Sequence, residues 1–258
     1  MKKALTYSRY FWDYLKNGDI GSIIASVNYL TNKTSHRTDR IITTSLGIFH
    51  CRKNTNDFQF ANYYYEWSVK KFLLKHRKEF SIFIDGGSCI GDYCILLSHF
   101  NIRCIAFEPV KSNFAQLTRN IELNDLETKI AAFPVGLGAH NALAKFFFNP
   151  VNTGASHLTH KNNPDGCEVE ICTFDSLVSA LKINKDENIL FKLDIEGMEV
   201  EAIQGAQNFI RDFPNITFVI ENKLTGKDSI KEILSKFATF KFGTVDEFNI
   251  YATKLSSN

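Results

Sequence analysis

The chain has 258 residues, of which 44% are hydrophobic and 22% charged, and its formal net charge is +2. This length suits one large domain with a full core, or one domain with a small extension. The composition is ordinary for a soluble globular protein, and no apolar run is long enough for a transmembrane helix. Polar and aromatic residues interrupt any signal-peptide core near the N-terminus, so a cytoplasmic location is expected.

The charge is unevenly distributed. Residues 1–80 hold 14 Lys and Arg against 6 Asp and Glu, whereas the remainder holds 16 against 22. The basic segment 1–80 could contact an anionic substrate, a membrane surface or the acidic remainder of the chain. A solvated basic face is an equally good interpretation.

Residues 1–35 have the pattern of aromatic-rich helices, with Tyr7, Tyr10, Phe11, Tyr14 and Leu15 at the spacing of one helix face. This stripe predicts packing on the main domain or on a second subunit of a homo-oligomer, with peripheral membrane contact as the alternative. A hairpin is expected at 41–51 and another aromatic helix at 60–75. We therefore expect an N-terminal helical and hairpin extension, 1–80, before a cofactor-binding domain, 81–258.

From residue 81 strands and helices alternate, which predicts an α/β fold with a doubly wound, mostly parallel sheet. Strands are expected at 81–85, 102–108, 129–136, 189–194 and 216–221, and helices at 92–100, 110–123, 198–213 and 229–237. Two final strands, 239–243 and 248–253, suggest an antiparallel edge strand. A long insert, 139–188, separates the third strand from the fourth.

A glycine-rich turn follows the first strand of this domain. Its residues Asp85, Gly86, Gly87, Ser88 and Gly91 allow the backbone to turn tightly and approach a ligand. The spacing is neither the G-x-G-x-x-G of dinucleotide sites nor a P-loop. Glu108 ends the second strand, where a carboxylate can accept hydrogen bonds from both ribose hydroxyls. Together these features predict a nucleotide-type cofactor.

Three ionisable residues, Lys192, Asp194 and Glu196, alternate at the end of the fourth strand. They are expected at the point where strand order reverses and open α/β sheets bind ligands. Close carboxylates raise each other's pKa, which suits a general base, while a structural Lys–carboxylate pair is the alternative. Glu221 ends the fifth strand on the same side, and His157 lies in the polar loop of the insert. Both are candidates for substrate contact.

The six cysteines do not form a C-x-x-C pair. This argues against a zinc site and against a disulfide framework, so no metal is expected.

Taken together, these motifs resemble the FkbM family of S-adenosylmethionine (SAM)-dependent methyltransferases, from about Asp39 to Glu221. The similarity is carried by the segments Asp85–Gly91, Ala106–Pro109, Lys192–Glu199 and Gly205–Ala206, with Phe174–Leu177. The sequence departs from the family pattern at Gly86 and Cys89, where a larger apolar residue and Asn are usual.

The resemblance implies a seven-stranded class I methyltransferase (Rossmann-like) fold that transfers methyl from SAM to a hydroxyl of a sugar, glycan or related metabolite. A carboxylate near the acceptor can take its proton, and we expect Asp194 or Glu196 to be this base, with Lys192 orienting or neutralising it. Pro109 and Val135 would border the cofactor, together with Asp85, Glu108, Asp194 and the glycine loop. The alternatives are a nucleic-acid methyltransferase, a metal-assisted enzyme using Asp194, Glu196 and Glu199, and a non-catalytic binding protein. An acidic main domain without an Asn-Pro-Pro-Tyr-type pocket argues against nucleic acid.

Overall fold

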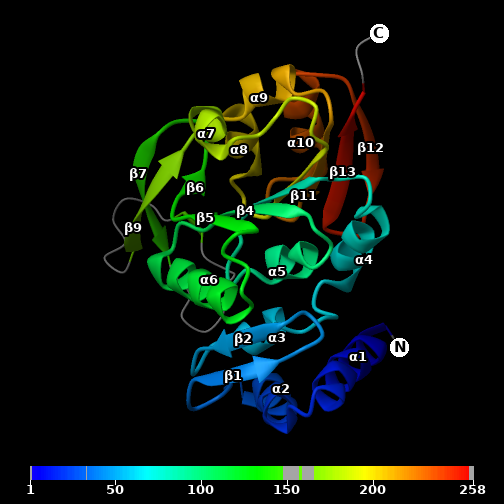
Figure 1. Cartoon of the computed structure of the whole chain (residues 1–258), viewed down its shortest axis with the longest axis vertical. Coiled ribbons are helices and arrows are strands. Elements are labelled where there is room, and N and C mark those ends of the chain that lie inside the picture. The colour runs from blue at the N-terminus through cyan, green and yellow to red at the C-terminus, as the bar shows by residue number, and fades with distance from the viewer. Residues whose placement is uncertain (1, 33, 148–156, 159–165, 256–258) are drawn as a thin grey trace.

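A seven-stranded sheet covered by helices on both faces forms the larger part of the molecule (Figure 1). The computed structural model describes residues 2–32, 34–147, 157–158 and 166–255. The strand order is β12-β13-β11-β10-β3-β4-β5. The strands are β3 (Ile82–Gly86), β4 (Arg103–Phe107), β5 (Ile130–Phe133), β10 (Ile189–Leu193), β11 (Ile216–Glu221), β12 (Phe240–Thr244) and β13 (Asn249–Lys254). This confirms the predicted mostly parallel seven-stranded fold.

Helices cover the two faces because neighbouring residues of each strand point to opposite sides. In β3, Phe83 packs in one core while Ile82 and Ile84 pack in the other. Figure 1 shows two groups of helices, α4 (Trp67–His76), α5 (Asp92–Ser98) and α6 (Lys111–Leu123) on one face and α7 (Phe174–Leu181), α8 (Glu199–Gln204), α9 (Gln207–Asp212) and α10 (Lys227–Ser235) on the other. Every residue of β3 and β10 is buried, as expected for a parallel sheet covered on both faces.

The central strands meet at a reversal of strand order. β3 pairs in parallel with β4 on one side and with β10 on the other. The register aligns Gly86 with both Phe107 and Leu193, so the three strands end level with one another. The residues that follow them, Gly87, Glu108 and Asp194, are thereby brought to one edge of the sheet.

The N-terminal region consists of α1 (Lys2–Lys16), α2 (Ile20–Asn32), the hairpin β1 (Arg40–Thr43) and β2 (Ile48–Cys51), and α3 (Asp57–Phe60). Tyr14, Phe49 and Phe58 belong to the same core cluster as Leu117 of α6. The core is therefore continuous from the N-terminal region to the sheet. The boundary at residue 80 remains a prediction.

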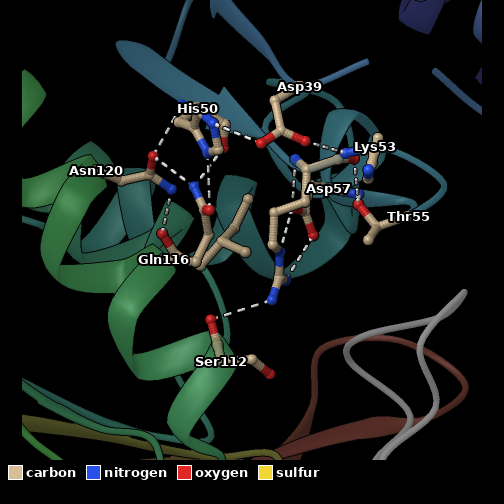
Figure 2. A network of polar contacts seen from close by, with 10 residues as sticks. Asp39, His50, Lys53, Thr55, Asp57, Ser112, Gln116 and Asn120 are labelled. Carbon is tan, nitrogen blue, oxygen red and sulfur yellow. Dashed lines mark hydrogen bonds and ion pairs between the residues drawn. The ribbon is translucent and has the colours of Figure 1, made fainter. Parts of the chain in front are cut away.

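Side chains of α6 replace a strand partner for β2 (Figure 2). The His50 amide donates to Asn120 Oδ1 at 2.9 Å, and Asn120 Nδ2 donates to the Ile90 carbonyl at 3.0 Å. Arg52 forms an ion pair with Asp57 at 2.7 Å and also donates to the Ser112 carbonyl. These bonds join the hairpin to α6 and to the turn before α5.

The structure differs from three of the predicted elements. Residues 61–66 are not helical, because α3 ends at Phe60 and the Asn62 side chain accepts from the Tyr64 amide, a local bond that competes with a helix. The predicted helix 198–213 is broken into α8 and α9 around Gly205, whose Cα lies so close to Gly138 that a Cβ would be 2.0 Å from the Gly138 carbonyl oxygen.

The third strand also ends earlier than predicted, at Phe133. The next residues form β6 (Gly136–Leu137) in a second sheet of order β6-β9-β7-β8, with β7 (Ala142–Phe147), β8 (His157–Leu158) and β9 (Gly166–Cys172). The insert therefore builds a small sheet of its own.

The antiparallel strand is β13, which lies second from the edge between β11 and β12. Within the residues that the structure describes, no helix is both long and apolar enough to span a bilayer.

Candidate active site

A cavity of about 240 Å³ lies at the carboxyl ends of the central strands. Several residues singled out in the sequence line it: Gly87, Glu108, Pro109, Lys192, Asp194, Glu196 and Glu221. Aromatic and acidic side chains from the N-terminal region, Phe60, Tyr65 and Glu66, complete one wall. The second sheet contributes Gly136, Leu137, Phe146 and Ile171 to the lining.

The glycine turn has a conformation that glycine alone accommodates easily. Gly87 has φ of +86°, and a Cβ there would lie 2.0 Å from the Asp194 carbonyl oxygen. Gly91 has φ of +88° and precedes α5, where a Cβ would meet Leu117 at 2.5 Å. The turn is held to the next strand by the Gly87 and Ser88 amides, which both donate to the Phe107 carbonyl.

Glu108 is fixed by the same turn. Its carboxylate accepts from the Cys89 amide at 2.9 Å and from the Val110 amide at 2.9 Å. Burial raises the pKa of Glu108 to about 7, against the lowering effect of these two bonds. Each carboxylate oxygen has a second lone pair, so a ligand with vicinal hydroxyls could still be bound here.

Lys192 lies between two carboxylates. Its Nζ is 3.1 Å from Asp194 Oδ2 and 3.7 Å from Asp85 Oδ1, and it lies over the Tyr93 ring. Burial lowers the pKa of Lys192, but the neighbouring Asp194 and Asp85 outweigh it and raise the pKa overall. Burial raises the pKa of Asp85 to about 6, with Lys192 opposing the shift. The pairing predicted as the structural alternative is thus present, and it holds Asp194 at the cavity wall.

Glu66 was not predicted from the sequence. It immediately precedes α4 in a left-handed conformation with φ of 48°, which turns its partly buried side chain to the cavity. The Tyr93 hydroxyl donates to Glu66 Oε2 at 2.6 Å. Burial, followed by the nearby Asp194 charge, raises the pKa of Glu66 to about 7. Glu66 was not recognised as a site residue because it lies in the segment 60–75 that was expected to be helical.

The turn after Asp194 is shaped by Glu199. Glu199 Oε1 accepts from the Ile195 and Gly197 amides, both at 3.1 Å, and Oε2 accepts from the Thr225 hydroxyl. These bonds hold Glu196 in a left-handed conformation with φ of 54° beside the cavity. Glu199 therefore stabilises the turn through its hydrogen bonds. The described residues include no group of three or more His, Cys, Asp or Glu that could hold a metal ion.

Glu221 and Lys223 also line the cavity. Burial, then the charges of Asp194 and Glu196, raises the pKa of Glu221 to about 8. The cavity therefore carries several carboxylates that take up a proton near neutral pH.

Other predicted site residues do not line the cavity but support it. Asp85, Gly86, Ser88 and Val135 are buried and are not among the residues that line the cavity. The Ser88 hydroxyl donates to the Asp85 carbonyl, and a Cβ on Gly86 would lie 2.9 Å from Leu193 Cδ2. His157 is described by its backbone alone, in β8, so its predicted substrate contact lies outside the described side chains.

The sequence matches the family model described as the methyltransferase FkbM domain over residues 85–243. It is 28% identical over 181 residues to the hexuronic acid methyltransferase AglP of Haloferax volcanii, covering 69% of this chain and 70% of that protein.

Solved structures with a similar fold include the methyltransferase FkbM of Methylobacillus flagellatus (18% identity, 68% of this chain and 44% of that chain, TM-score 0.47). They also include the N-terminal domain of human METTL16 in complex with SAH (14% identity, 93% and 82% of the two chains, TM-score 0.39). The chain spans less than half of the Methylobacillus structure. Since the family model covers more than half of the chain, this protein is a methyltransferase of the FkbM family.

Proposed function

We propose that the protein transfers a methyl group from SAM to a hydroxyl group of a sugar or glycan. The observation that carries the proposal is the convergence of Glu108 and Asp194, from two strands that flank β3, on one cavity at the reversal of strand order.

The residues present fit a nucleoside with a charged tail. Glu108 offers lone pairs to ribose hydroxyls, and Phe107, Val110 and Leu137 give an apolar wall for a base. Carboxylates at the other end, among them Asp194, suit the ammonium and sulfonium charges. When bound, SAM supplies an electrophilic methyl group, so the protein has to align the acceptor oxygen and exclude water.

A carboxylate of the cavity takes the proton that the acceptor hydroxyl loses as its oxygen bonds to the methyl carbon and the carbon–sulfur bond breaks. Asp194 and Glu196 are the bases predicted from the sequence, with Lys192 orienting Asp194 through the 3.1 Å contact. Glu66 is a third candidate, because a base with a pKa of about 7 works efficiently near neutral pH.

The acceptor class rests on the similarity to AglP, a hexuronic acid methyltransferase. In this chain the exposed Lys223 lines the cavity beside Glu221 and offers a cation to a sugar carboxylate. We infer that a hexuronate-bearing glycan is the acceptor.

Calorimetric titration with SAM and with its demethylated product tests the cofactor. We expect micromolar binding by the wild type. Glu108→Gln should bind at least about tenfold more weakly, because the variant loses charge-assisted hydrogen bonds to the ligand. Glu122→Gln, an exposed change on α6, is the matched control. Absence of SAM binding at millimolar concentration would contradict the proposal.

Mass spectrometry of candidate glycans after incubation with SAM tests the acceptor. A gain of one methyl that survives mild alkali identifies an ether on a hydroxyl. Loss of the methyl in alkali would instead identify an ester on the uronic carboxyl and refute O-methylation at a hydroxyl.

A further inference from the structure

An apolar strip lies on the outer side of α2, away from the site described above. Ile20, Ile24, Val27 and Leu30 follow one another at intervals of four and three residues, the spacing of one helix face. Their exposed fractions are 64%, 56%, 49% and 45%. We call these four residues the α2 face. Trp12 and Leu15 of α1 are also exposed, so apolar surface continues on the neighbouring helix.

The α2 face is held firmly on the molecule. Ser22 and Ala25, on the opposite side of α2, are buried. The preceding helix is anchored by the Tyr14 hydroxyl, which donates to the Phe58 carbonyl at 2.7 Å. In Figure 1, α1 and α2 lie at the end of the molecule opposite α7–α10.

A second cavity, of about 530 Å³, runs along α2 and includes Ile24 of the α2 face. Its walls are polar and basic, with Asn28, Ser35, Arg37 and Arg40 among them. Ser35 is 7% exposed, and neither Ser35 Oγ nor Arg40 Nη1 has a hydrogen-bond partner within the described part of the chain. Buried polar atoms usually have partners, so these atoms point to a ligand with acceptor oxygens.

The exposed charges of the described residues up to 38 are of one sign. Between residues 1 and 38 the sequence has two acids, Asp13 and Asp19, and both are buried. Asp13 accepts from the Ser45 hydroxyl and the Tyr63 amide, while Asp19 pairs with Arg40 at 2.9 Å. The exposed charges of α1 and of the loop after α2 include Arg9, Lys16 and Arg37. The apolar residues are thus accompanied by exposed cations and by no exposed acid among the described residues of this segment.

We propose that the α2 face and the basic cavity beside it bind the surface of a membrane containing anionic phospholipids. Exposed isoleucine, valine and leucine side chains enter the boundary between headgroups and acyl chains, while the arginines meet phosphate oxygens. A second copy of the chain is a poorer occupant, because a two-fold interface would place the same cations against one another. The proposal does not depend on the methylation reaction.

Co-sedimentation of the full-length protein with vesicles tests the proposal. We expect binding to vesicles of phosphatidylcholine with one quarter phosphatidylglycerol, and much weaker binding to phosphatidylcholine alone. The double change Ile24→Ser with Val27→Ser should weaken binding about tenfold or more. Leu143→Ser, at an exposed leucine of β7, is the control that should bind as the wild type.

A second pair of variants tests the contribution of the cations to vesicle binding. Arg37→Gln should weaken binding about fivefold, the effect of one cation near an anionic surface, and Lys241→Gln on the edge strand should not. Methyl transfer to a soluble acceptor should be the same in all of these variants.

Three results would overturn the proposal. They are equal binding to neutral and anionic vesicles, unchanged binding in both variants of the surface, and a dimer in sedimentation velocity that the Ile24 and Val27 changes dissociate. Saturable binding of inorganic phosphate without vesicle binding would assign the cavity to a soluble anion instead.

Discussion

At the scale of single residues, Glu66 differs from the other carboxylates of the cavity in its origin. It comes from the N-terminal region, before the first strand of the sheet and outside the segment that matches the family model. Its pKa of about 7 means that it is protonated below neutral pH and ionised above it. A base acts in its ionised form, so activity that depends on Glu66 rises with pH.

We therefore expect the rate of methyl transfer in the wild type to rise as the pH increases through about 7. Glu66→Gln should lower kcat by about 10²-fold or more, the usual effect of losing a general base, and should remove this rise. Glu79→Gln, at an exposed glutamate after α4, is the control. A variant that keeps both kcat and the pH profile would transfer the role to Asp194 or Glu196.

The Tyr93 hydroxyl also affects the pKa of the Glu66 carboxyl. Its 2.6 Å hydrogen bond favours the ionised form of Glu66 and so lowers the pKa of that carboxyl. Tyr93→Phe should shift the rise in the pH–rate profile to higher pH while leaving the plateau close to that of the wild type. A lowered plateau without a shift would show that Tyr93 has a structural role only.

Glu108 makes a prediction about stability. Its pKa is raised from 4.5 to about 7 in the folded protein, so the folded state binds the proton more tightly than the unfolded state. The contribution of Glu108 to the free energy of unfolding is greatest below pH 4.5 and decreases as the pH rises to about 7, by about 3 kcal/mol.

Urea unfolding of wild type and Glu108→Gln at pH 5 and pH 8 measures this effect. The difference in free energy of unfolding between the two proteins should move in favour of the variant at pH 8. Asp85 and Glu221 also have raised pKa values, but they are present in both proteins and cancel in the comparison. A pH-independent difference would refute the raised pKa of Glu108.

At the scale of elements, the glycine turn joins β3 to the turn that follows β10. Gly87→Ala should be strongly destabilising, because the new Cβ would meet the Asp194 carbonyl oxygen at 2.0 Å. Gly18→Ala is a matched control, with φ of +72° against +86° and no heavy atom within 4 Å of its new Cβ. The control should cost about 1 kcal/mol, the backbone strain alone.

Chemical unfolding of the two alanine variants separates strain from collision. We expect Gly87→Ala to lose at least about 2 kcal/mol more than Gly18→Ala, and to lose SAM binding even where it remains folded. Equal losses would mean that the turn can move away from Asp194.

The sheet was predictable because β3, β4, β10 and β11 are mostly apolar, and each ends in, or is followed directly by, a glycine or a charged residue. The site residues that follow such strands were predictable for the same reason. The breaks in predicted helices were not, because they depend on contacts distant in sequence, such as the approach of Gly205 to Gly138. The position of Glu66 at the cavity could not be predicted either. It depends on a left-handed backbone conformation directly before α4, which the aromatic pattern around it does not indicate.

At the scale of the whole molecule, the N-terminal region shares a core and a buried hydrogen-bond network with the sheet. Asn120 is fully buried and bridges β2 to the turn before α5 through His50 and Ile90. Phe49 of β2 packs in the same cluster as Leu117 of α6. Two segments joined in this way are expected to unfold together, although the composition of the chain suggests an extension and a separate domain.

Differential scanning calorimetry tests this coupling. The wild type should show one cooperative transition, and Asn120→Ala should lower its midpoint without splitting it. Removal of the amide leaves the buried His50 N–H and Ile90 carbonyl without that partner, at about 1–3 kcal/mol for each group. Asn215→Ala, whose side chain makes a 3.5 Å exposed bond far from this interface, should change the midpoint little. A separate transition at lower temperature in the wild type would show that residues 1–80 fold independently, and Glu66 would then reach the active site through docking of two domains.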